Sequence, residues 1–261
     1  MSLNNLEKFT AKIRSGRFCL GTVITLSDPV VSELAGDCGM DFTWIDAEHA
    51  PFSLETIQAH VMALRGTDCA PLVRVAWNDL AIIKPVLDLA PAGVIIPMIN
   101  SAEQAEAAVA YCKYPPRGKR GCGIRRGNRY GQVPLQKYIA EADKQPWVIV
   151  QIEHVDAVKN LDAILKVPGI DSICIGPTDL SGSMGILGES QNPELNAVIE
   201  EICRKTLAAG LILGTASAPY QTWKARGLHW MALTSDCGGM ISNYKQILEL
   251  AANESGSNHS G

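Results

Sequence analysis

The feature that most constrains the fold is a regular alternation of short apolar segments with longer amphipathic ones. Eight apolar, β-branched segments have the character of strands, at 19–24, 42–48, 70–75, 93–98, 147–153, 171–176, 211–216 and 230–235. Segments with helical periodicity lie between them, at 29–39, 53–65, 79–89, 101–112, 155–166, 193–209 and 241–252. Apolar strands that are each followed by a helix indicate a parallel sheet buried on both faces. Eight such units predict an α/β fold, a single closed (β/α)8 TIM barrel.

The length of the chain allows this interpretation without requiring it. The 261 residues could form two modest domains or one barrel, because such barrels often have about 250 residues. The composition, 47% hydrophobic and 19% charged, supports a large core, and no change in composition marks a domain boundary. We therefore predict one barrel domain over residues 1–252 and a disordered tail at 253–261.

Charge and cysteine content exclude several classes of protein. The 23 Lys and Arg against 27 Asp and Glu give a net charge of −4, which argues against a nucleic-acid partner. No apolar run is long enough for a membrane span or a signal region, so we expect a cytoplasmic protein without a membrane partner. The eight cysteines form no CxxC pair, which predicts reduced, mostly structural thiols. Cys237 lies near the end of a predicted strand and is the cysteine least easily explained as a structural residue.

Polar residues interrupt the apolar pattern where the predicted strands end. In a barrel of this type, catalytic residues collect at the carboxyl ends of the strands. The residues in question, by strand, are Asp46, Glu48 and His49 for the second, Arg74 for the third, Gln151, Glu153 and His154 for the fifth, and Asp179 for the sixth. These ends predict an active site.

Glu153 and Asp179 follow consecutive strands, which lie about 4.8 Å apart in a parallel sheet. Two carboxylates at matching height can converge on a divalent cation such as Mg²⁺ or Mn²⁺ and leave open positions for water or a chelating substrate. The alternative is that both are solvated loop acids or helix caps, since a helix can start near residue 180.

Arg74 and His49 are the other candidates for chemistry. A guanidinium between apolar residues needs an anionic partner, which can be a substrate carboxylate or a developing oxyanion. The alternative for Arg74 is an internal salt bridge to Asp46 or Glu48. His49 is suited to act as a general base near neutral pH, although a single histidine is as often a surface residue. No predicted strand carries a lysine, so a Schiff-base mechanism has no obvious nucleophile.

Several strings in the sequence resemble the HpcH/HpaI aldolase family. The most specific are IDAEHAP (45–51), VQIEHVDAVKNLDAIL (150–165) and GPTDLSGSMG (176–185), and the likeness extends from about residue 15 to 250. Members of that family are metal-dependent class II pyruvate aldolases with a TIM barrel fold. The resemblance implies an aldehyde-lyase that exchanges its last helix between subunits of a homo-oligomer, a trimer or a hexamer.

The resemblance also implies roles for individual residues. Glu153 and Asp179 match the ligands of a divalent metal ion, Mg²⁺ or Mn²⁺ with Co²⁺ as an alternative. Arg74 matches the arginine that contacts the substrate oxygen as the enolate forms. His49 matches the proposed base, and Asp88 matches the acid that pairs with this histidine. Residues matching those that orient the metal waters or hold the substrate are Asp46, Gln151, Pro177 and Thr178.

Departures from the family pattern concern the substrate. Val23 and Thr178 stand where better-known members have tryptophan and alanine. The segment 113–134 is long and irregular, and we expect it at the face of the barrel that carries the site. It is basic at six positions, and Arg125 and Arg126 are candidates to bind a distal carboxylate or phosphate of the aldehyde. The alternative for these arginines is a solvated loop or salt bridges between subunits. The six basic positions are Arg117, Lys119, Arg120, Arg125, Arg126 and Arg129.

The primary hypothesis is reversible retro-aldol cleavage of a 4-hydroxy-2-oxo acid to pyruvate and an aldehyde through a metal-bound enolate. The first alternative is a condensing enzyme of the same superfamily that joins an enolate or acetyl-CoA to an oxo acid. The second is a barrel that binds small oxo acids without catalysis.

Overall fold

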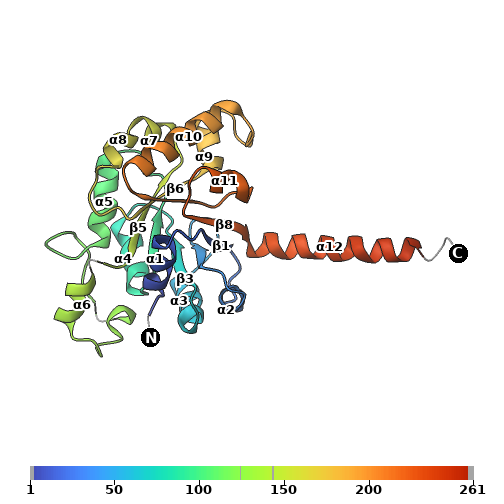
Figure 1. Cartoon of the computed structure of the whole chain (residues 1–261). Coiled ribbons are helices and arrows are strands. Elements are labelled where there is room, and N and C mark those ends of the chain that lie inside the picture. The colour runs from blue at the N-terminus through green and yellow to red at the C-terminus, as the bar shows by residue number, and fades with distance from the viewer. Residues whose placement is uncertain (1–2, 124, 143, 258–261) are drawn as a thin grey trace.

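The predicted barrel is confirmed. The structure is a computed structural model that describes residues 3–123, 125–142 and 144–257. Eight parallel strands form a closed barrel in chain order, each paired with its sequence neighbours (Figure 1). The strands are β1 (Cys19–Ile24), β2 (Phe42–Asp46), β3 (Ala70–Arg74), β4 (Gly93–Ile96), β5 (Trp147–Ile152), β6 (Ser172–Ile175), β7 (Ile212–Thr215) and β8 (Trp230–Ser235).

Helices cover the outside of the barrel, and several begin at a side-chain cap. Ser53, Asp79 and Ser101 each accept a hydrogen bond from a backbone N–H in the first turn, which fixes where the helix starts. The helices that follow strands are α2 (Val30–Asp37), α3 (Leu54–Ala63), α4 (Leu80–Asp88), α5 (Ala102–Cys112), α7 (Val155–Lys159), α8 (Leu161–Ile164), α9 (Pro177–Ser183), α10 (Pro193–Ala208), α11 (Tyr220–Ala225) and α12 (Asp236–Ser257). Among the described residues, two further α-helices, α1 (Leu6–Arg14) and α6 (Leu135–Ala142), are outside the predicted pattern.

The inward-facing side chains form a core of their own. Aromatic rings dominate it, since Phe42 and Trp44 pack against Trp230 with ring centroids 5.4 and 6.2 Å away. The outward-facing aliphatic residues of the strands pack against the helices in a second, larger cluster. The barrel is therefore a packed core whose upper layer can present polar groups at the carboxyl ends of the strands.

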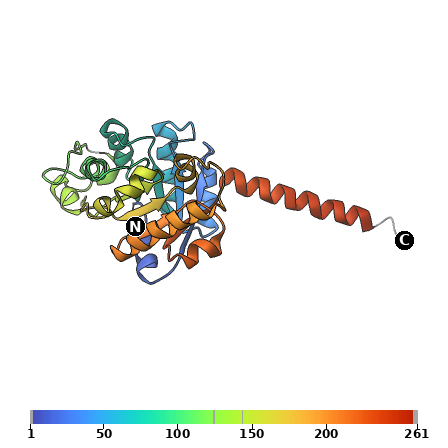
Figure 2. The ribbon, with the colours of Figure 1, turned by 90° about the horizontal axis from the view of Figure 1, so that it is seen from above.

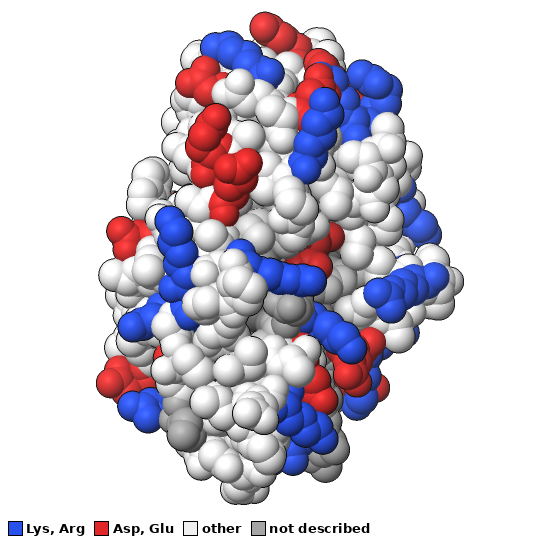
Figure 3. Space-filling model, turned by 90° about the vertical axis from the view of Figure 1, so that its left-hand side faces the viewer, with Lys and Arg blue, Asp and Glu red and all other residues white. Residues whose placement is uncertain are grey.

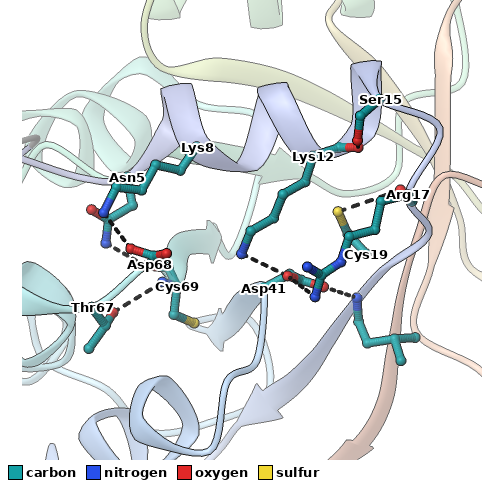
Figure 4. A network of polar contacts seen from close by, with 11 residues as sticks. Asn5, Lys8, Lys12, Ser15, Arg17, Cys19, Asp41, Thr67, Asp68 and Cys69 are labelled. Carbon is teal, nitrogen blue, oxygen red and sulfur yellow. Dashed lines mark hydrogen bonds and ion pairs between the residues drawn. The ribbon is translucent and has the colours of Figure 1, made fainter.

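Helix α1 closes the opposite end of the barrel. Phe9 is fully buried, with its ring centroid 5.6 Å from that of Phe42 and 5.3 Å from that of Trp147. The buried carboxylate of Asp41 lies 2.8 Å from Lys12 Nζ and 3.1 Å from Arg17 Nη2 (Figure 4). These contacts hold α1 across the barrel floor, at the opposite end from the carboxyl ends of the strands.

Helix α12 leaves the barrel and projects away from it in both views (Figures 1 and 2). It runs to Ser257, so it continues through the first five residues of the expected tail, and residues 258–261 lie outside the described residues. Its exposed apolar side chains have helical spacing, at Met240, Ile241, Tyr244, Ile247, Leu248 and Leu250. No helix in the described ranges is long and apolar enough to cross a membrane.

The basic segment is not at the face that we expected. It follows α5, and a helix returns the chain to the end of the barrel where the strands begin. Arg126 is 4% exposed, and its guanidinium donates to the carbonyl oxygens of Leu89 and Ala90, at 3.0 and 3.3 Å, and of Leu3, at 3.3 Å. Figure 3 shows this side of the molecule, where Lys and Arg are spread among Asp and Glu. Within one chain, neither Arg126 nor its exposed neighbour Arg125 reaches the carboxyl ends of the strands.

Arg126→Ala is expected to destabilise the protein by about 3 kcal/mol, because it leaves buried carbonyl groups without donors. The control is Arg125→Ala, which removes an exposed guanidinium and should cost less than about 1 kcal/mol. Urea unfolding of the two variants measures the difference. Equal stability of both variants would contradict this structural role for Arg126.

Candidate active site

A cavity of about 340 Å³ opens at the carboxyl ends of the strands. Its wall contains six of the residues predicted for the site, namely His49, Arg74, Gln151, Pro177, Thr178 and Asp179. Val23, Trp44, Ile175, Gly176 and Ala216 complete it. The position agrees with the rule that barrel enzymes carry their chemistry at this face.

Arg74 lies at the centre of a network of charges. The register of β2 and β3 pairs it with Asp46, whose Oδ1 and Oδ2 lie 3.0 Å from Nε and 2.6 Å from Nη2. Arg74 Nη1 lies 2.9 Å from Glu48 Oε2. The salt bridges considered as an alternative are therefore present. A guanidinium has five N–H groups, so these three contacts leave donors that can still face the cavity.

The turn after β2 places His49 at the rim of the cavity. Asp46 Oδ1 accepts hydrogen bonds from the backbone N–H of Glu48 at 3.1 Å and of His49 at 3.4 Å. The His49 ring is 64% exposed, and its Nε2 lies 3.8 Å from Glu48 Oε2. Burial raises the pKa of Glu48, while the positive charge of Arg74 opposes the rise. The structure thus offers His49 an acidic neighbour within its own chain.

Glu153 is an ionisable group buried at the edge of this cavity. It is 2% exposed, and its Oε1 accepts a hydrogen bond from the backbone N–H of Met98 at 2.8 Å. Gln151 Nε2 donates to the other oxygen. Burial raises the pKa of Glu153 to about 7, the Met98 hydrogen bond opposes this, and the charge of Asp179 adds to it. A buried carboxylate of this kind is a group that a cation would stabilise.

Two residues that hold Glu153 in place were not predicted from the sequence. Met98 has φ 55°, a left-handed conformation that is strained for a non-glycine residue, and its N–H points at Glu153. Gly176 lies against the same side chain, because a Cβ built there would be 2.5 Å from Glu153 Oε2. Met98 acts through its backbone, so its side-chain type gave no signal. Gly176 gave a weak signal, as a glycine at the end of the predicted strand and three residues before the predicted acid Asp179.

The residues present fit a hard divalent cation. Glu153 and Asp179 supply carboxylates, and Gln151 Oε1 is buried without a hydrogen-bond partner in the cavity wall. Oxygen ligands of this kind suit Mg²⁺ and Mn²⁺. Among the described residues no group of three or more His, Cys, Asp and Glu side chains could hold a metal ion. The two-carboxylate set therefore leaves most positions of such an ion to water or substrate.

Gly176→Ala is expected to weaken Mn²⁺ binding at least about tenfold, because the added methyl group must displace the Glu153 carboxylate. Gly182→Ala is the matched control on α9, since a Cβ there would meet only Leu187 Cδ1, at 3.3 Å. Calorimetric titration of both variants with Mn²⁺ tests this. Wild-type affinity in the Gly176 variant would show that Glu153 takes no part in binding the ion.

The structure does not bring Asp88 to His49 within one chain. Helices in this fold run back toward the start of the strands, so Asp88, the last residue of α4, lies at the opposite end of the barrel from His49. Its Oδ1 lies 3.4 Å from Arg120 Nη2. Asp88 lines a separate cavity together with Arg125 and Arg126. The predicted pairing does not form within a single chain, and between two chains it stays a prediction.

Comparison with known proteins supports the predicted class of site. The family model described as HpcH/HpaI aldolase/citrate lyase matches residues 21–242, which covers the whole barrel. The chain belongs to this family. Aldolases and citrate lyases are carbon–carbon lyases, so membership confirms the predicted resemblance and the enzyme class that it implied.

Curated relatives of this family member match nearly its whole length. A hydroxypyruvate/pyruvate aldolase from Roseobacter denitrificans is 34% identical over 245 residues, which is 93% of this chain and 96% of the relative. A 5-keto-4-deoxy-D-glucarate aldolase from Citrobacter koseri is 37% identical over 248 residues, 93% of this chain and 95% of the relative.

Solved structures agree on the fold. The crystal structure of an HpcH/HpaI aldolase from Desulfitobacterium hafniense matches with a TM-score of 0.85 at 28% identity, covering 93% of this chain and 95% of that one. A citrate synthase, SbnG, matches with a TM-score of 0.85 at 26% identity, covering 97% and 99%.

Proposed function

We propose that the protein is a divalent-metal-dependent aldolase that cleaves a 4-hydroxy-2-oxo acid reversibly to pyruvate and an aldehyde. The observation that carries this proposal is the buried carboxylate of Glu153, with its raised pKa, beside a cavity lined by Asp179 and Arg74. The two relatives named as aldolases support the reaction class, and one of them is named for hydroxypyruvate as well as pyruvate.

The side chains of the cavity have separable tasks in this reaction. A divalent cation held by Glu153 and Asp179 would supply the positive charge that stabilises an enolate. The N–H groups of Arg74 that no carboxylate occupies would donate to the developing negative oxygen. His49, exposed at the rim, would take the proton of the 4-hydroxyl group. Cleavage of the C3–C4 bond then leaves its electron pair on the pyruvate half and releases the aldehyde.

The test is pyruvate release from a 4-hydroxy-2-oxo acid, measured with and without EDTA and after Mg²⁺, Mn²⁺ or Co²⁺ is restored. We expect chelation to abolish turnover and one of the ions to recover it. Turnover that survives complete removal of metal would overturn the proposed mechanism.

We also propose that the enzyme is a homo-oligomer in which α12 is exchanged between subunits. The projecting helix supports this, because Ile241, Tyr244 and Leu248 are each more than half exposed in the single chain. The pairing of His49 with Asp88 then forms between chains, since the two residues lie at opposite ends of one barrel. A trimer or a hexamer, as the family resemblance implies, can be distinguished by light scattering.

A condensing enzyme is the second candidate, favoured by the similarity to the citrate synthase structure at 26% identity. Such an enzyme would join an enolate or acetyl-CoA to an oxo acid. Calorimetric titration with acetyl-CoA separates the two reactions, since a simple aldolase is expected to show no binding.

A further inference from the structure

A further cavity, of about 270 Å³, lies at the end of the barrel where the strands begin. Three arginines line it, Arg65 from the short 3-10 helix η1 (Leu64–Gly66) and Arg126 and Arg129 from the basic segment. The rest of its wall is neutral, and no Asp or Glu of the described ranges contributes to it. The other lining residues are Leu3, Met62, Tyr130 and Gln132. This cavity shares no lining residue with the active-site cavity.

Arg126 is the buried cation of this cavity, and within the described part of the chain it forms no ion pair with a carboxylate. Its guanidinium donates to backbone carbonyl oxygens, which are neutral. Burial lowers the pKa of Arg126, and the positive charge of Arg65 lowers it further, with Tyr130 opposing the shift. A buried charge without a counter-charge costs free energy, and the neighbouring arginine adds repulsion. An anion in the cavity would relieve both.

The turn that carries Arg129 is held in a strained conformation. Arg129 and Tyr130 have φ 54° and 57°, two consecutive left-handed conformations at residues other than glycine. Asn128, 1% exposed, fixes this turn: its Oδ1 accepts from the Gly131 N–H at 3.2 Å and its carbonyl oxygen from the Val133 N–H at 3.0 Å. The backbone from which Arg129 and Tyr130 reach the cavity is therefore ordered before a ligand binds, which favours binding.

Three guanidinium groups around one cavity favour an anion with several oxygens and more than one negative charge. Each guanidinium presents its N–H groups as a planar fork, which matches phosphate and carboxylate oxygens. A carboxylate has two oxygens and one charge, whereas a phosphate group has three or four oxygens and carries up to two charges near neutral pH. We propose that Arg65, Arg126 and Arg129 form a phosphate-binding site, separate from the active site, for inorganic phosphate or the phosphate group of a small metabolite.

The test is calorimetric titration with inorganic phosphate in about 150 mM NaCl, which screens weak attraction to exposed charges. The protein is free of metal, so that no cation at the active site can hold the phosphate. We expect Arg65→Ala to weaken binding at least about tenfold. Arg65 is exposed and forms no ion pair within the described ranges, so the variant should fold normally. Arg125→Ala is the matched control, because Arg125 is exposed in the basic segment but does not line this cavity, and phosphate affinity should stay within about twofold of the wild type.

Three results would overturn the proposal. Absence of phosphate binding is the first. Equal loss of affinity in Arg65→Ala and Arg125→Ala is the second, because it would show diffuse attraction to the basic segment. The third is loss of binding in a folded Arg74→Gln, which would place the phosphate in an active site of the same or a neighbouring subunit.

Titration with glycerol 3-phosphate distinguishes the two sources of the phosphate group. Tighter binding than that of inorganic phosphate would identify an organic phosphate as the ligand, and equal or weaker binding would identify the free ion. Either result supports the site, provided that Arg65→Ala weakens it. None of these measurements reads enzyme activity, so they stand whether or not the proposed aldolase reaction is confirmed.

Discussion

Glu153→Gln is expected to lower kcat/KM for pyruvate release by at least about 10³-fold while making the metal-free protein more stable at pH 8. The loss of activity follows from removal of a carboxylate that the cation needs. The gain in stability follows because a buried charge is replaced by a neutral amide of the same shape. An ordinary structural residue would change activity and stability in the same direction, so the opposite signs identify a functional group.

The pH dependence of this effect has a definite sign. The pKa of Glu153 is raised from 4.5 to about 7, so the folded protein holds this proton more tightly than the unfolded chain. The contribution of Glu153 to stability therefore falls as pH rises from about 4.5 to 7 and stays low above that. The Glu153→Gln variant lacks this dependence. Its free energy of unfolding should exceed that of the wild type by roughly 1–3 kcal/mol above pH 7, and the difference should vanish below about pH 4.5.

Urea unfolding of the metal-free proteins at pH 5 and pH 8 measures this difference. Asp179→Asn is the control, because Asp179 is exposed and its neutralisation should reduce Mn²⁺ affinity without a comparable gain in stability. Wild-type Mn²⁺ affinity in Glu153→Gln would remove the main support for the proposed metal site.

The barrel and most of its active-site cavity follow from the sequence because both depend on local patterns. Each strand was predicted to within two residues at either end, since a fully buried strand must be apolar along its whole length. A charged residue inside such a segment, such as Arg74, is therefore conspicuous. Parallel strands present their carboxyl ends on one face, so Arg74 and Asp179 share a cavity although 105 positions separate them in the sequence.

The sequence predictions fail where the position of a residue depends on the direction in which the chain runs, or where its contribution comes from the backbone. The basic segment was placed at the active-site face, but α5 intervenes and returns the chain to the other end of the barrel. The pairing of Asp88 with His49 came from the family resemblance, and it stays a prediction for two chains, since within one chain a residue at the end of a helix lies far from one just after a strand. Met98 was missed because its contribution is a backbone N–H, which every residue except proline has.

Mixed oligomers of His49→Ala and Asp88→Ala are expected to regain activity that neither variant has alone. If the pair forms between chains, an Asp88→Ala chain supplies the histidine and a His49→Ala chain supplies the aspartate of one intact site. Random mixing of equal amounts should then restore about a quarter of wild-type activity, because half of the chains carry each intact residue. Co-expression with two different affinity tags yields these oligomers, and pyruvate release measures the recovery.

The alternative is that Glu48, with Oε2 3.8 Å from His49 Nε2, is the only acid that this histidine uses. In that case Asp88 serves only the ion pair with Arg120, so Asp88→Ala alone would keep most of its activity and mixing would add nothing. Glu48→Gln separates the two cases further, although it also removes a negative charge next to Arg74 Nη1. Recovery in the mixed oligomers would show that the active site is completed by a second subunit, which explains why one barrel separates two residues with a shared task.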